Sequence, residues 1–596
     1  MDNQANFIAS QFDKQGQRPR TMHRPTPRVA TSFFPQKVAG SPDGKLRVMV
    51  LGGLEEVGRN CTVIEYEDDI IIIDMGVQFP EEDMPGIDYV IPNMSYLKGK
   101  EKNIRGVIIT HGHYDHIGAI PHCMGQIGNP PMFMGKLTTG IVAKRQEEFR
   151  SAPKLDIIII DEKSKIKLGR NFEVEFFRVN HTIPDSFGIV VNTPHGLVIH
   201  SGDFKFDHSP INEPPADLQR IAQLGSRNVL ALMLDSTSAE KPGHNISESQ
   251  VADEIEKIFE KASGRIILGT FASLISRIQI VIECAEKFGR KILIEGRSMQ
   301  TNTEIAHNLG YLHFKPGTFI EPEEGLRLPD NKLVIIGTGA QGQQNAFLMR
   351  FANDEHKYLS VKQGDLVIFS SSVIPGNERT IQGLKDTLYR KGARVIHYQM
   401  MDVHAGGHAQ AEDLKLMIRL IKPRYFIPIE AYHYMLRIHA DLAESVGIPK
   451  ETIFVADNGQ VMEFTRAGGR LTQEKVMSDY VFVDGLGVGD VSEVVLRDRQ
   501  QMAADGMFVV IATVDKKTGQ LMGSPDIISR GFVYMKENKK LIEAARDKVK
   551  KIMHGHDPKS AADDMYIKGK LRNEVGQLLY VKTKRRPMIL PVVIYV

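Results

Sequence analysis

The sequence predicts an α/β protein built from several domains, and three observations support this fold class. The chain has 596 residues, more than one hydrophobic core usually organises, so we expect roughly two to four domains. From residue 46 onward, short apolar runs bounded by glycine alternate with amphipathic segments, which is typical of layered sheets and helices. The alternation starts afresh near residues 240 and 500, where we expect new α/β segments to begin.

Composition is that of an ordinary globular protein, with 42% hydrophobic and 25% charged residues. The net charge of +2 is small for this length, so an anionic partner would have to be bound by local patches. Three widely separated cysteines form no disulfide scaffold or Cys-x-x-Cys zinc site, and no run resembles a signal core or a membrane span. We therefore expect a cytoplasmic protein without membrane association.

The N-terminal residues 1–45 lack helical or strand periodicity and are rich in Gln, Arg, Pro, Ser and Thr. Seven basic residues against three acidic ones give this arm a charge of +4. We interpret it as a disordered basic extension, which either contacts nucleic acid or a partner or only aids solubility.

The first candidate metal ligands follow the third of three predicted strands, at 47–51, 70–74 and 107–110. Neutral imidazole and carboxylate are ligands that zinc prefers, and one cluster of them can serve two neighbouring ions. A solvated histidine-rich turn is the alternative, but the density of the cluster favours a metal site. We expect Asp74 to orient this loop through hydrogen bonds. The candidate ligands are His111, His113, Asp115 and His116.

Two further candidate ligands follow later strands. His181 comes after the strand-like run 172–178, and Asp203 comes after the run 189–199. Either residue alone would more often be a cap or a core residue, but their order behind the histidine cluster favours metal ligation. Another apolar strand begins at Leu230 and ends in Asp235, Ser236 and Thr237.

A second α/β segment follows from residue 240. A capping box formed by Ser247 and Gln250 predicts a helix that ends at Lys261. Polar glycine loops after later strands could cradle phosphate with backbone amides and hydroxyls, although ordinary turns look similar. The predicted strands are 265–269, 291–295, 333–337, 366–370 and 394–398, a second helix covers 273–288, and the loop residues are Gly339, Gly342, Ser371 and Ser372.

The segment after this region carries His404 and His408 in the run His-Ala-Gly-Gly-His. Structural histidines in a turn are one interpretation, but the two glycines favour the close backbone approach of a functional loop. A helix ending at Ile421 then leads to a stretch that contains Glu430 and His433.

Beyond Arg499 we predict a small α/β domain with strands at 508–514 and 531–534 and a helix at 537–553. A basic cluster precedes the apolar end of the chain, and it either contacts nucleic acid or is a solvated strand end. Its members are Lys582, Lys584, Arg585 and Arg586.

The run His-x-His-x-Asp-His, followed in order by His181 and Asp203, resembles the metallo-β-lactamase superfamily, whose members cleave lactams, thioesters, sulfate esters and phosphodiesters. With the α/β insertion and the later histidine pair, the chain resembles the β-CASP nucleases. From about residue 46 to its end it is similar to the bacterial ribonuclease J family. The matching stretches include 296–299, 402–409, 422–428 and 483–490.

This resemblance implies a metallo-β-lactamase αββα sandwich made of residues 46–239 and 395–470. It places an inserted β-CASP α/β domain at 240–394, a linker at 471–499, and a small C-terminal α/β domain at 500–596 that takes part in subunit assembly. It also implies a homodimer or homotetramer, with a paralogue or a degradosome component as a further partner.

The resemblance further implies a metal-dependent ribonuclease with 5′-to-3′ exonuclease and endonuclease activity on single-stranded RNA, preferring a 5′-monophosphate, in RNA maturation and decay. Two Zn²⁺ ions, with Mn²⁺ or Mg²⁺ as alternatives at the second position, would support attack of hydroxide on the phosphodiester, leaving 5′-phosphate products. His111, His113, His181 and Asp203 would hold one ion, and Asp115, His116 and Asp203 the other.

The family also assigns roles beyond the metal ligands. His404 and His408 would grip the scissile phosphate and protonate the leaving oxygen, a task suited to imidazole. Asp235 would support the active site, and Asp115 would be a catalytic residue as well as a metal ligand. The weaker candidates for substrate contacts are Ser236, Gly339, Gly342, Ser371 and Ser372.

Two residues depart from the family pattern. Glu430 stands where the family has a histidine ligand of the second ion, and its carboxylate could rebuild that position with harder character. His433 is a second candidate for the same position. Gly406 replaces a serine and removes a hydroxyl from the phosphate pocket. Two alternatives stay open: a weakly active RNA-binding subunit that pairs with an active paralogue, and a hydrolase of the same fold that acts on a thioester or lactam.

Overall fold

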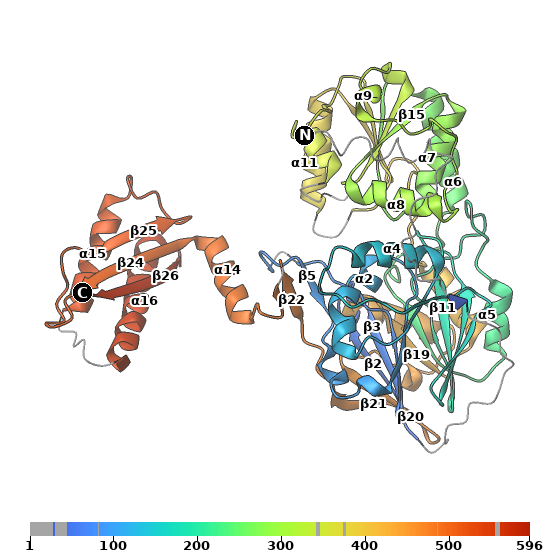
Figure 1. Ribbon diagram of the computed structural model, residues 1–596, viewed down its shortest axis with the longest axis horizontal. Helices are drawn as coiled ribbons and strands as arrows, with labels where there is room; N and C mark the ends of the chain where they lie inside the picture. Colours follow the sequence, from blue (N-terminus) through green and yellow to red (C-terminus); the bar gives the residue numbers. More distant parts are fainter. Residues whose placement is uncertain are drawn as a thin grey trace, which may run out of the picture. The chain divides into compact units, whose positions relative to one another are not determined.

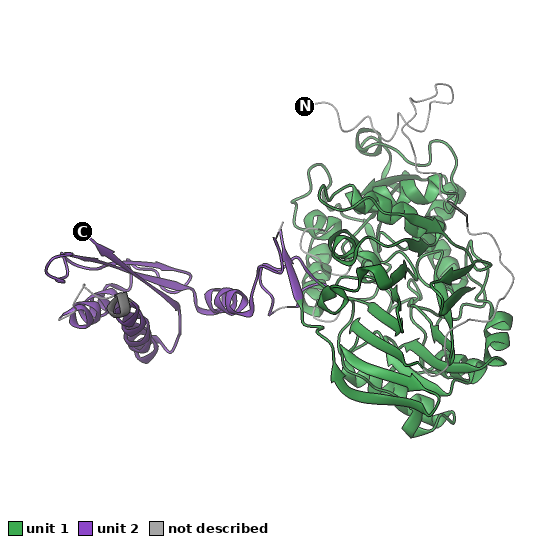
Figure 2. Cartoon of the chain, turned by 60° about the horizontal axis from the view of Figure 1, so that its bottom comes forward, with its two compact units in different colours: residues 1–78, 91–480 green, residues 79–90, 481–596 purple. Residues whose placement is uncertain are grey.

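The computed structural model describes residues 28–29, 44–81, 83–340, 342, 346–373, 377–485, 487–554 and 561–596. It divides into two compact units, one of residues 1–78 and 91–480 and the other of residues 79–90 and 481–596 (Figure 2). Apart from 28–29 and 44–45, the predicted basic extension lies outside the described residues. Among the described helices, none combines the length and apolarity that crossing a bilayer requires.

Two large sheets packed face to face form much of the first unit (Figure 1). Their strands are rich in Ile, Val and Leu because both faces of each sheet are largely covered. The nine-stranded sheet has the order β1 (Arg28–Val29), β8 (Ile157–Ile159), β7 (Met132–Met134), β6 (Ile104–Ile108), β4 (Asp69–Ile73), β3 (Cys61–Tyr66), β2 (Leu46–Gly52), β20 (Gln460–Thr465) and β21 (Gly468–Lys475). The six-stranded sheet has the order β19 (Tyr425–Ile429), β13 (Val229–Asp235), β12 (Gly196–His200), β11 (Phe187–Thr193), β10 (Phe172–Arg178) and β9 (Lys165–Leu168).

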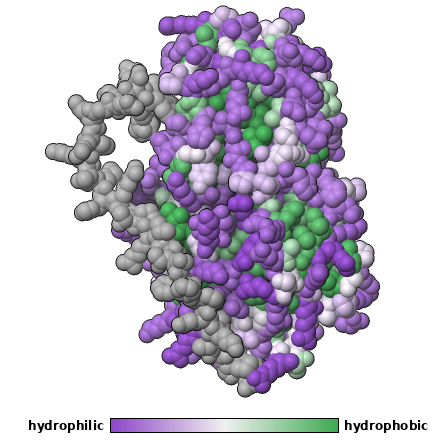
Figure 3. Space-filling model, turned by 90° about the vertical axis from the view of Figure 1, so that its right-hand side faces the viewer, coloured by the Kyte–Doolittle hydropathy of each residue, from purple (hydrophilic) through white to green (hydrophobic). Residues whose placement is uncertain are grey.

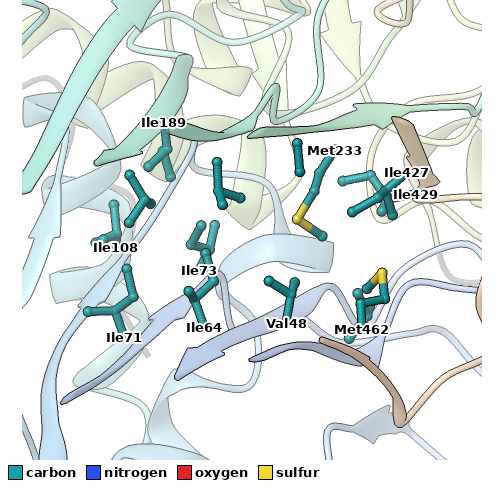
Figure 4. Close-up of a cluster of buried hydrophobic side chains, with 14 of the residues drawn as sticks. Val48, Ile64, Ile71, Ile73, Ile108, Ile189, Met233, Ile427, Ile429 and Met462 are labelled. Atoms are coloured by element: carbon teal, nitrogen blue, oxygen red, sulfur yellow. The ribbon is translucent and has the colours of Figure 1, made fainter. Parts of the chain in front are cut away.

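The core of the first unit lies between these two sheets. Val48 and Ile73 project from the nine-stranded sheet toward Met233 and Ile427 of the six-stranded sheet, and all four are fully buried (Figure 4). A second buried cluster covers the outer face of the six-stranded sheet. This layered arrangement confirms the predicted sandwich. The helices that flank it are α2 (Tyr114–Ile117), α3 (Ile120–Cys123), α4 (Lys136–Gln146), α5 (Leu218–Gly225), α12 (Ala411–Ile421) and α13 (His433–Ser445).

A five-stranded parallel sheet with helices on its faces forms the upper part of the first unit in Figure 1. Because β14, β16 and β17 are parallel neighbours, the loops after these three strands leave from one edge, the usual ligand position in such sheets. Ser247 and Gln250 form the predicted capping box of α6. The sheet has the order β15 (Lys291–Glu295), β16 (Leu333–Gly337), β14 (Ile266–Gly269), β17 (Leu366–Phe369) and β18 (Arg394–His397), with helices α6 (Glu248–Lys261), α7 (Ile275–Lys287), α8 (Arg297–Asn308), α9 (Pro322–Gly325), α10 (Phe347–Ala352) and α11 (Glu378–Arg390).

The second unit contains two small sheets and three helices among its described residues. One sheet is stabilised by a core with two helices, in which Phe508, Val510, Leu571 and Val575 are fully buried. The strand order of this sheet is β25 (Asp526–Arg530), β24 (Met507–Val514) and β26 (Met588–Tyr595), and the two helices packed on it are α15 (Lys539–Met553) and α16 (Ala561–Thr583). The other sheet has the order β23 (Gly487–Val488), β22 (Val481–Asp484) and β5 (Tyr89–Ile91), and the third helix is α14 (Glu493–Asp505).

Three features differ from the sequence predictions. The run 189–199 is a hairpin of β11 and β12, because Pro194 and His195 occupy a turn. The predicted strand at 531–534 is wrong: β25 ends at Arg530, and Gly531 turns the chain with a φ of 69°. Helix α16 was not predicted, although its buried residues recur every four positions.

Candidate metal centre and active site

The histidine loop follows β6, and Asp74 holds its first turn. The backbone N–H and the hydroxyl of Thr110 each donate to the Asp74 carboxylate at 2.8 Å, and so does His116 Nδ1. Asp74 is 1% exposed and has a φ of 62°, which is uncommon for a residue other than glycine. These bonds fix the imidazole of His116 so that its Nε2 is directed at the neighbouring carboxylates.

Four side chains form the first donor cluster, and their ligand atoms lie within 4.8 Å of one another. His113 Nδ1 is 3.0 Å from His111 Nε2 and 3.1 Å from His181 Nε2. Asp203 Oδ2 is 3.6 Å from His111 Nε2 and 3.5 Å from His181 Nε2. Three imidazole nitrogens and one carboxylate oxygen therefore converge, which is a donor set that suits zinc.

The protonation states of this cluster also suit a metal ion. Burial lowers the pKa of His111 and His181 well below the ordinary value, and that of His113 to about 4. Burial opposes ionisation of Asp203, but the surrounding imidazoles, His116 first, outweigh it and hold the pKa of Asp203 well below its usual range. Neutral imidazoles and an ionised carboxylate are the forms that bind metal.

A second donor cluster adjoins the first and shares Asp203 with it. Asp203 Oδ1 lies 3.3 Å from His116 Nε2, whereas Asp203 Oδ2 faces His111 and His181. Asp115 Oδ2 lies 3.6 Å from His116 Nε2. The two oxygens of Asp203 thus serve different clusters, which is the geometry of a carboxylate that bridges two ions.

Glu430 is the first residue after β19 and is 5% exposed. One of its carboxylate oxygens lies within 4.8 Å of ligand atoms of Asp74 and His116. Neither oxygen has a hydrogen-bond partner among the described residues, and His200 Nε2 is 3.8 Å away. Burial and repulsion from Asp203 raise the pKa of Glu430 well above its ordinary value.

The position of Glu430 provides a test of whether the second cluster fits a metal ion. A buried carboxylate without a partner is costly, and a divalent cation beside His116 would supply that partner. The donors therefore fit a second ion. His433 does not join them: its side chain is 46% exposed and lies 3.3 Å from Glu55 Oε1, in a separate surface group with Asp457.

His408 faces the clusters from the return segment. Its Nδ1 lies 2.9 Å from Asp235 Oδ2 and 3.9 Å from Asp203 Oδ2. Asp235 ends β13, and the N–H and hydroxyl of Thr237 donate to its other oxygen at 2.9 and 2.7 Å. Burial alone would lower the pKa of His408, but Asp235 and Asp203 outweigh it and raise the pKa to about 9. His408 is therefore a cation at neutral pH.

The turn that carries His408 is held from two sides. His181 Nδ1 donates to Gly407 O at 2.7 Å, and Asn245 Nδ2 donates to His408 O at 3.0 Å. A Cβ at Gly407 would lie 2.6 Å from His181 Cε1, so the turn requires glycine there. At Gly406 the nearest neighbour would be 3.5 Å away, so a serine side chain would find room.

His404 differs from His408 in charge and surroundings. Its Nδ1 has no hydrogen-bond partner among the described residues, and its ring lies 6.3 Å from that of Phe271. Burial, with the cations Arg277 and Lys205 nearby, lowers the pKa of His404 to about 3. His404 is therefore neutral at physiological pH.

The remaining predicted contacts fall into two groups. Ser236 is fully buried, and its hydroxyl bonds to His439 Nδ1 at 2.8 Å and to Leu234 O at 3.3 Å, which directs it into the interior and away from a substrate. The other four residues lie in the loops after β16 and β17, and the Ser371 hydroxyl is buried without a partner among the described residues. They are Gly339, Gly342, Ser371 and Ser372.

Three residues of this region were not singled out from the sequence. Asn60 Nδ2 donates to His116 Nε2 at 3.0 Å, His200 faces Glu430, and Asn245 holds the return turn. The glycine-bearing turn before Asn60 and the Ser-Gly-Asp run after His200 were the available signals. Asn245 had no local signal, because its partners are more than 160 residues away in the chain.

Three family models match the chain. They are "Metallo-beta-lactamase superfamily" over residues 54–263, "Ribonuclease J, beta-CASP domain" over residues 263–388, and "Ribonuclease J C-terminal domain" over residues 494–596. Ribonuclease J 1 of Streptococcus pyogenes is 42% identical over 92% of this chain and 97% of its own. Ribonuclease J of Thermus thermophilus is 39% identical over 95% and 98%, and Ribonuclease J2 of Bacillus subtilis is 38% identical over 92% and 99%.

A solved structure also resembles this fold. The crystal structure of a protein of unknown function from Enterococcus faecalis V583 matches with a TM-score of 0.52 and 18% sequence identity, covering 70% of this chain and 100% of that chain. At this identity the likeness concerns the fold alone.

Proposed function

Because the chain belongs to the ribonuclease J family, we propose that it is a two-metal ribonuclease that hydrolyses single-stranded RNA. The proposal includes 5′-to-3′ exonuclease and endonuclease cleavage that leaves 5′-phosphate products, in RNA maturation and decay. One observation carries it: two donor clusters share Asp203, and the cationic His408 lies 3.9 Å from that carboxylate.

We assign the first cluster to a zinc ion and the second to an ion with harder character. Two adjacent divalent ions supply an activated water and neutralise charge on the phosphoryl group. The first cluster contributes three neutral imidazoles. The second contributes the oxygens of Asp115 and Asp203 with only one imidazole, that of His116, and Glu430 approaches the same imidazole in a further group with Asp74. Carboxylate oxygens around a single imidazole are a donor set that favours Mn²⁺ or Mg²⁺ over zinc.

His408 has the features of a phosphate contact and a proton donor. Its Nδ1 is engaged by Asp235, so its Nε2 is the position that can donate to a phosphate oxygen or to the leaving 3′-oxygen. The raised pKa keeps this proton in place at neutral pH. His404, which is neutral, would be a second hydrogen-bonding group for the scissile phosphate.

The loops after β16 and β17 are our candidates for recognition of a 5′-monophosphate. They leave the same edge of the parallel sheet, and Ser370 N and Thr270 N tie neighbouring strand ends together through Gly269 O and Gly337 O at 2.9 and 3.0 Å. A Cβ at Gly342 would lie 3.3 Å from Asn377, the N-cap residue directly before α11, so Gly342 lies against a helix N-terminus. Gly339, Gly342, Ser371 and Ser372 would supply amides and hydroxyls.

A pocket in the first unit supports a path for the RNA strand. It lies beside the first metal cluster, between sandwich residues such as His181 and residues near the five-stranded sheet such as Gln279 and Tyr311. Hydrophilic side chains cover most of the face shown in Figure 3, with hydrophobic residues in separate patches. An RNA strand on this unit would be bound by local contacts, with unstacked bases packed on side chains.

Self-association and location are part of the same proposal. One face of the β24–β26 sheet carries exposed apolar residues, including Ile528, Val592 and Ile594, which supports assembly into a homodimer or homotetramer. A paralogue or degradosome component would be a further partner. The three cysteines are buried free thiols, which suits the reducing cytoplasm that we propose as the location.

One alternative function has a specific observation in its favour. Asn60 donates to His116 Nε2, the atom that the second ion requires, and the pKa of Glu430 is raised well above its ordinary value. If these groups keep the second ion out, the chain would be a weakly active RNA-binding subunit that pairs with an active paralogue.

The deciding experiment follows end-labelled RNA. Purified protein is incubated with 5′-monophosphate and 5′-triphosphate RNA under Zn²⁺, Mn²⁺ and Mg²⁺, beside the variant Asp115→Ala/His116→Ala. We expect metal-dependent cleavage, faster on the monophosphate, that the double substitution abolishes. Equal degradation by wild type and variant would refute the metal mechanism, and RNA binding without cleavage under all three metals would favour the subunit role.

A further inference from the structure

Arg277, on α7, is a buried arginine that makes no contact with the metal clusters yet joins three separate segments. None of its surface is exposed. Its Nη1 donates to the Ser370 hydroxyl and, at 2.6 Å, to Val403 O, while its Nη2 donates to Glu248 Oε2 at 2.7 Å. The Ser370 hydroxyl donates to the same Val403 O at 2.7 Å. The guanidinium thus connects Ser370, the start of the loop 370–372 after β17 (the serine loop), to the residue that precedes His404.

The network continues from Glu248 to the segment that carries Asp203. Lys205 Nζ lies 3.3 Å from Glu248 Oε1 and 3.4 Å from Asp207 Oδ2. Burial opposes ionisation of Glu248, but Arg277 and Lys205 outweigh it and lower the pKa of Glu248 to about 2. Two basic and two acidic side chains are thus paired with one another in the interior, where an unpaired charge would be costly.

The contacts of Arg277 complete the support of the turn between Val403 and His408. His181 and Asn245 hold Gly407 and His408 at its far end. Arg277 and Ser370 hold Val403 at its near end. Both ends of the turn are thereby fixed, one against the metal cluster and the other against the five-stranded sheet.

We propose that Arg277 is a positioning residue that sets the placement of the turn bearing His404 and His408 and links this turn to the serine loop. The inference rests on the proposed ribonuclease function. Planar guanidinium can bind Val403 O, Ser370 and Glu248 together in fixed directions, which a lysine ammonium on a flexible stem would not reproduce. A shift of about 1 Å in a catalytic group can lower the rate about 100-fold.

The test compares Arg277→Met with a matched buried arginine. Arg265 is 2% exposed and pairs with both oxygens of Asp365, at 2.8 and 2.6 Å, just before β14, the same strand after which α7 begins. Arg265→Met therefore also removes a buried arginine from its pair with a buried carboxylate. kcat and KM are measured on 5′-monophosphorylated single-stranded RNA with the full chain. The temperature is one at which circular dichroism shows each variant folded and mass spectrometry shows equal metal content.

We expect Arg277→Met to lower kcat about 100-fold with KM changed less than about threefold. Arg277→Lys should fall between Arg277→Met and wild type, and Arg265→Met should lower Tm while leaving kcat within about twofold of wild type. Equal kcat values for Arg277→Met and Arg265→Met would overturn the inference.

The variant Ser370→Ala tests the inference if Arg277→Met does not fold. It removes the hydrogen bond from the Ser370 hydroxyl to Val403 O and removes no charged group. A fall in kcat of about tenfold is expected, and an unchanged kcat would overturn the inference. A wild-type protein that cleaves no RNA would instead refute the proposed function, and this inference with it.

Discussion

Asp235 Oδ2 lies 2.9 Å from His408 Nδ1, which joins the end of β13 to a turn 173 residues later in the chain. The carboxylate reverses the effect of burial on the imidazole and makes it a cation. A cluster of neutral imidazoles thus lies beside the cationic imidazole of His408. In the proposed mechanism, this difference in charge separates metal binding from phosphate binding.

The variant Asp235→Asn should show the consequence of that pair for pH dependence. His408 keeps its proton below its raised pKa of about 9, so activity that needs this proton is present below that pH and lost above it. Without the carboxylate the pKa falls toward 6.5, so the alkaline limb of kcat/KM against pH should move to lower pH. Ser236→Ala, which removes the hydroxyl bonds to His439 and to Leu234 O and leaves Asp235 in place, serves as the control. Identical limbs for Asp235→Asn and wild type would contradict this role of Asp235.

Substitution of Glu430 should change which metal the second position prefers. Glu430→His replaces an oxygen donor with an imidazole, so bound zinc should increase relative to manganese. Glu430→Gln should weaken the second ion about tenfold or more, because it removes an anionic donor. Titration calorimetry and manganese electron paramagnetic resonance measure both effects, with Glu55→Gln in the separate surface group as control. Metal content that is the same in all four proteins would show that Glu430 binds no ion.

Adjacent glycines offer a steric test of the return turn. Gly407→Ala places a methyl group 2.6 Å from His181 Cε1, so His181 must move, and we expect less zinc bound and kcat lowered about 10- to 100-fold. Gly406→Ser, where the nearest atom is 3.5 Å away, should keep the zinc content and at least the wild-type rate. Equal losses in the two variants would mean that crowding at His181 is not the cause.

Local patterns in the sequence predict the elements that build the site. Apolar runs fixed most strands to within a few residues, because strands covered on both faces need continuous Ile, Val and Leu. Ser247 with Gln250 predicted the start of α6, since a capping box is a local signal. The clustering of His111, His113, His181 and Asp203 also follows from the sequence, because each comes at or just after the end of a strand.

The features that sequence reasoning missed depend on contacts between distant segments. Arg277 donates a hydrogen bond to Val403 O and Asn245 donates one to His408 O, and each pair is more than 120 positions apart in the chain. No local sequence pattern therefore marks Arg277 or Asn245. The sequence predicted Ser236 as a substrate contact, but its hydroxyl forms a buried hydrogen bond with His439 on α13. That Glu430 has no hydrogen-bond partner among the described residues becomes visible only when β19 lies beside β13.

The measurement that tests the account most directly is the cleavage rate of Asp203→Asn on 5′-monophosphorylated single-stranded RNA under manganese and zinc. Asp203 is the one residue shared by both donor clusters, so we expect kcat to fall at least about 1000-fold with RNA binding retained. Asp457→Asn, in the exposed group with Glu55 and His433, is the matched control and should cleave at the wild-type rate. If Asp203→Asn and Asp457→Asn cleave RNA at the same rate, the two-metal centre described here is not the catalytic site.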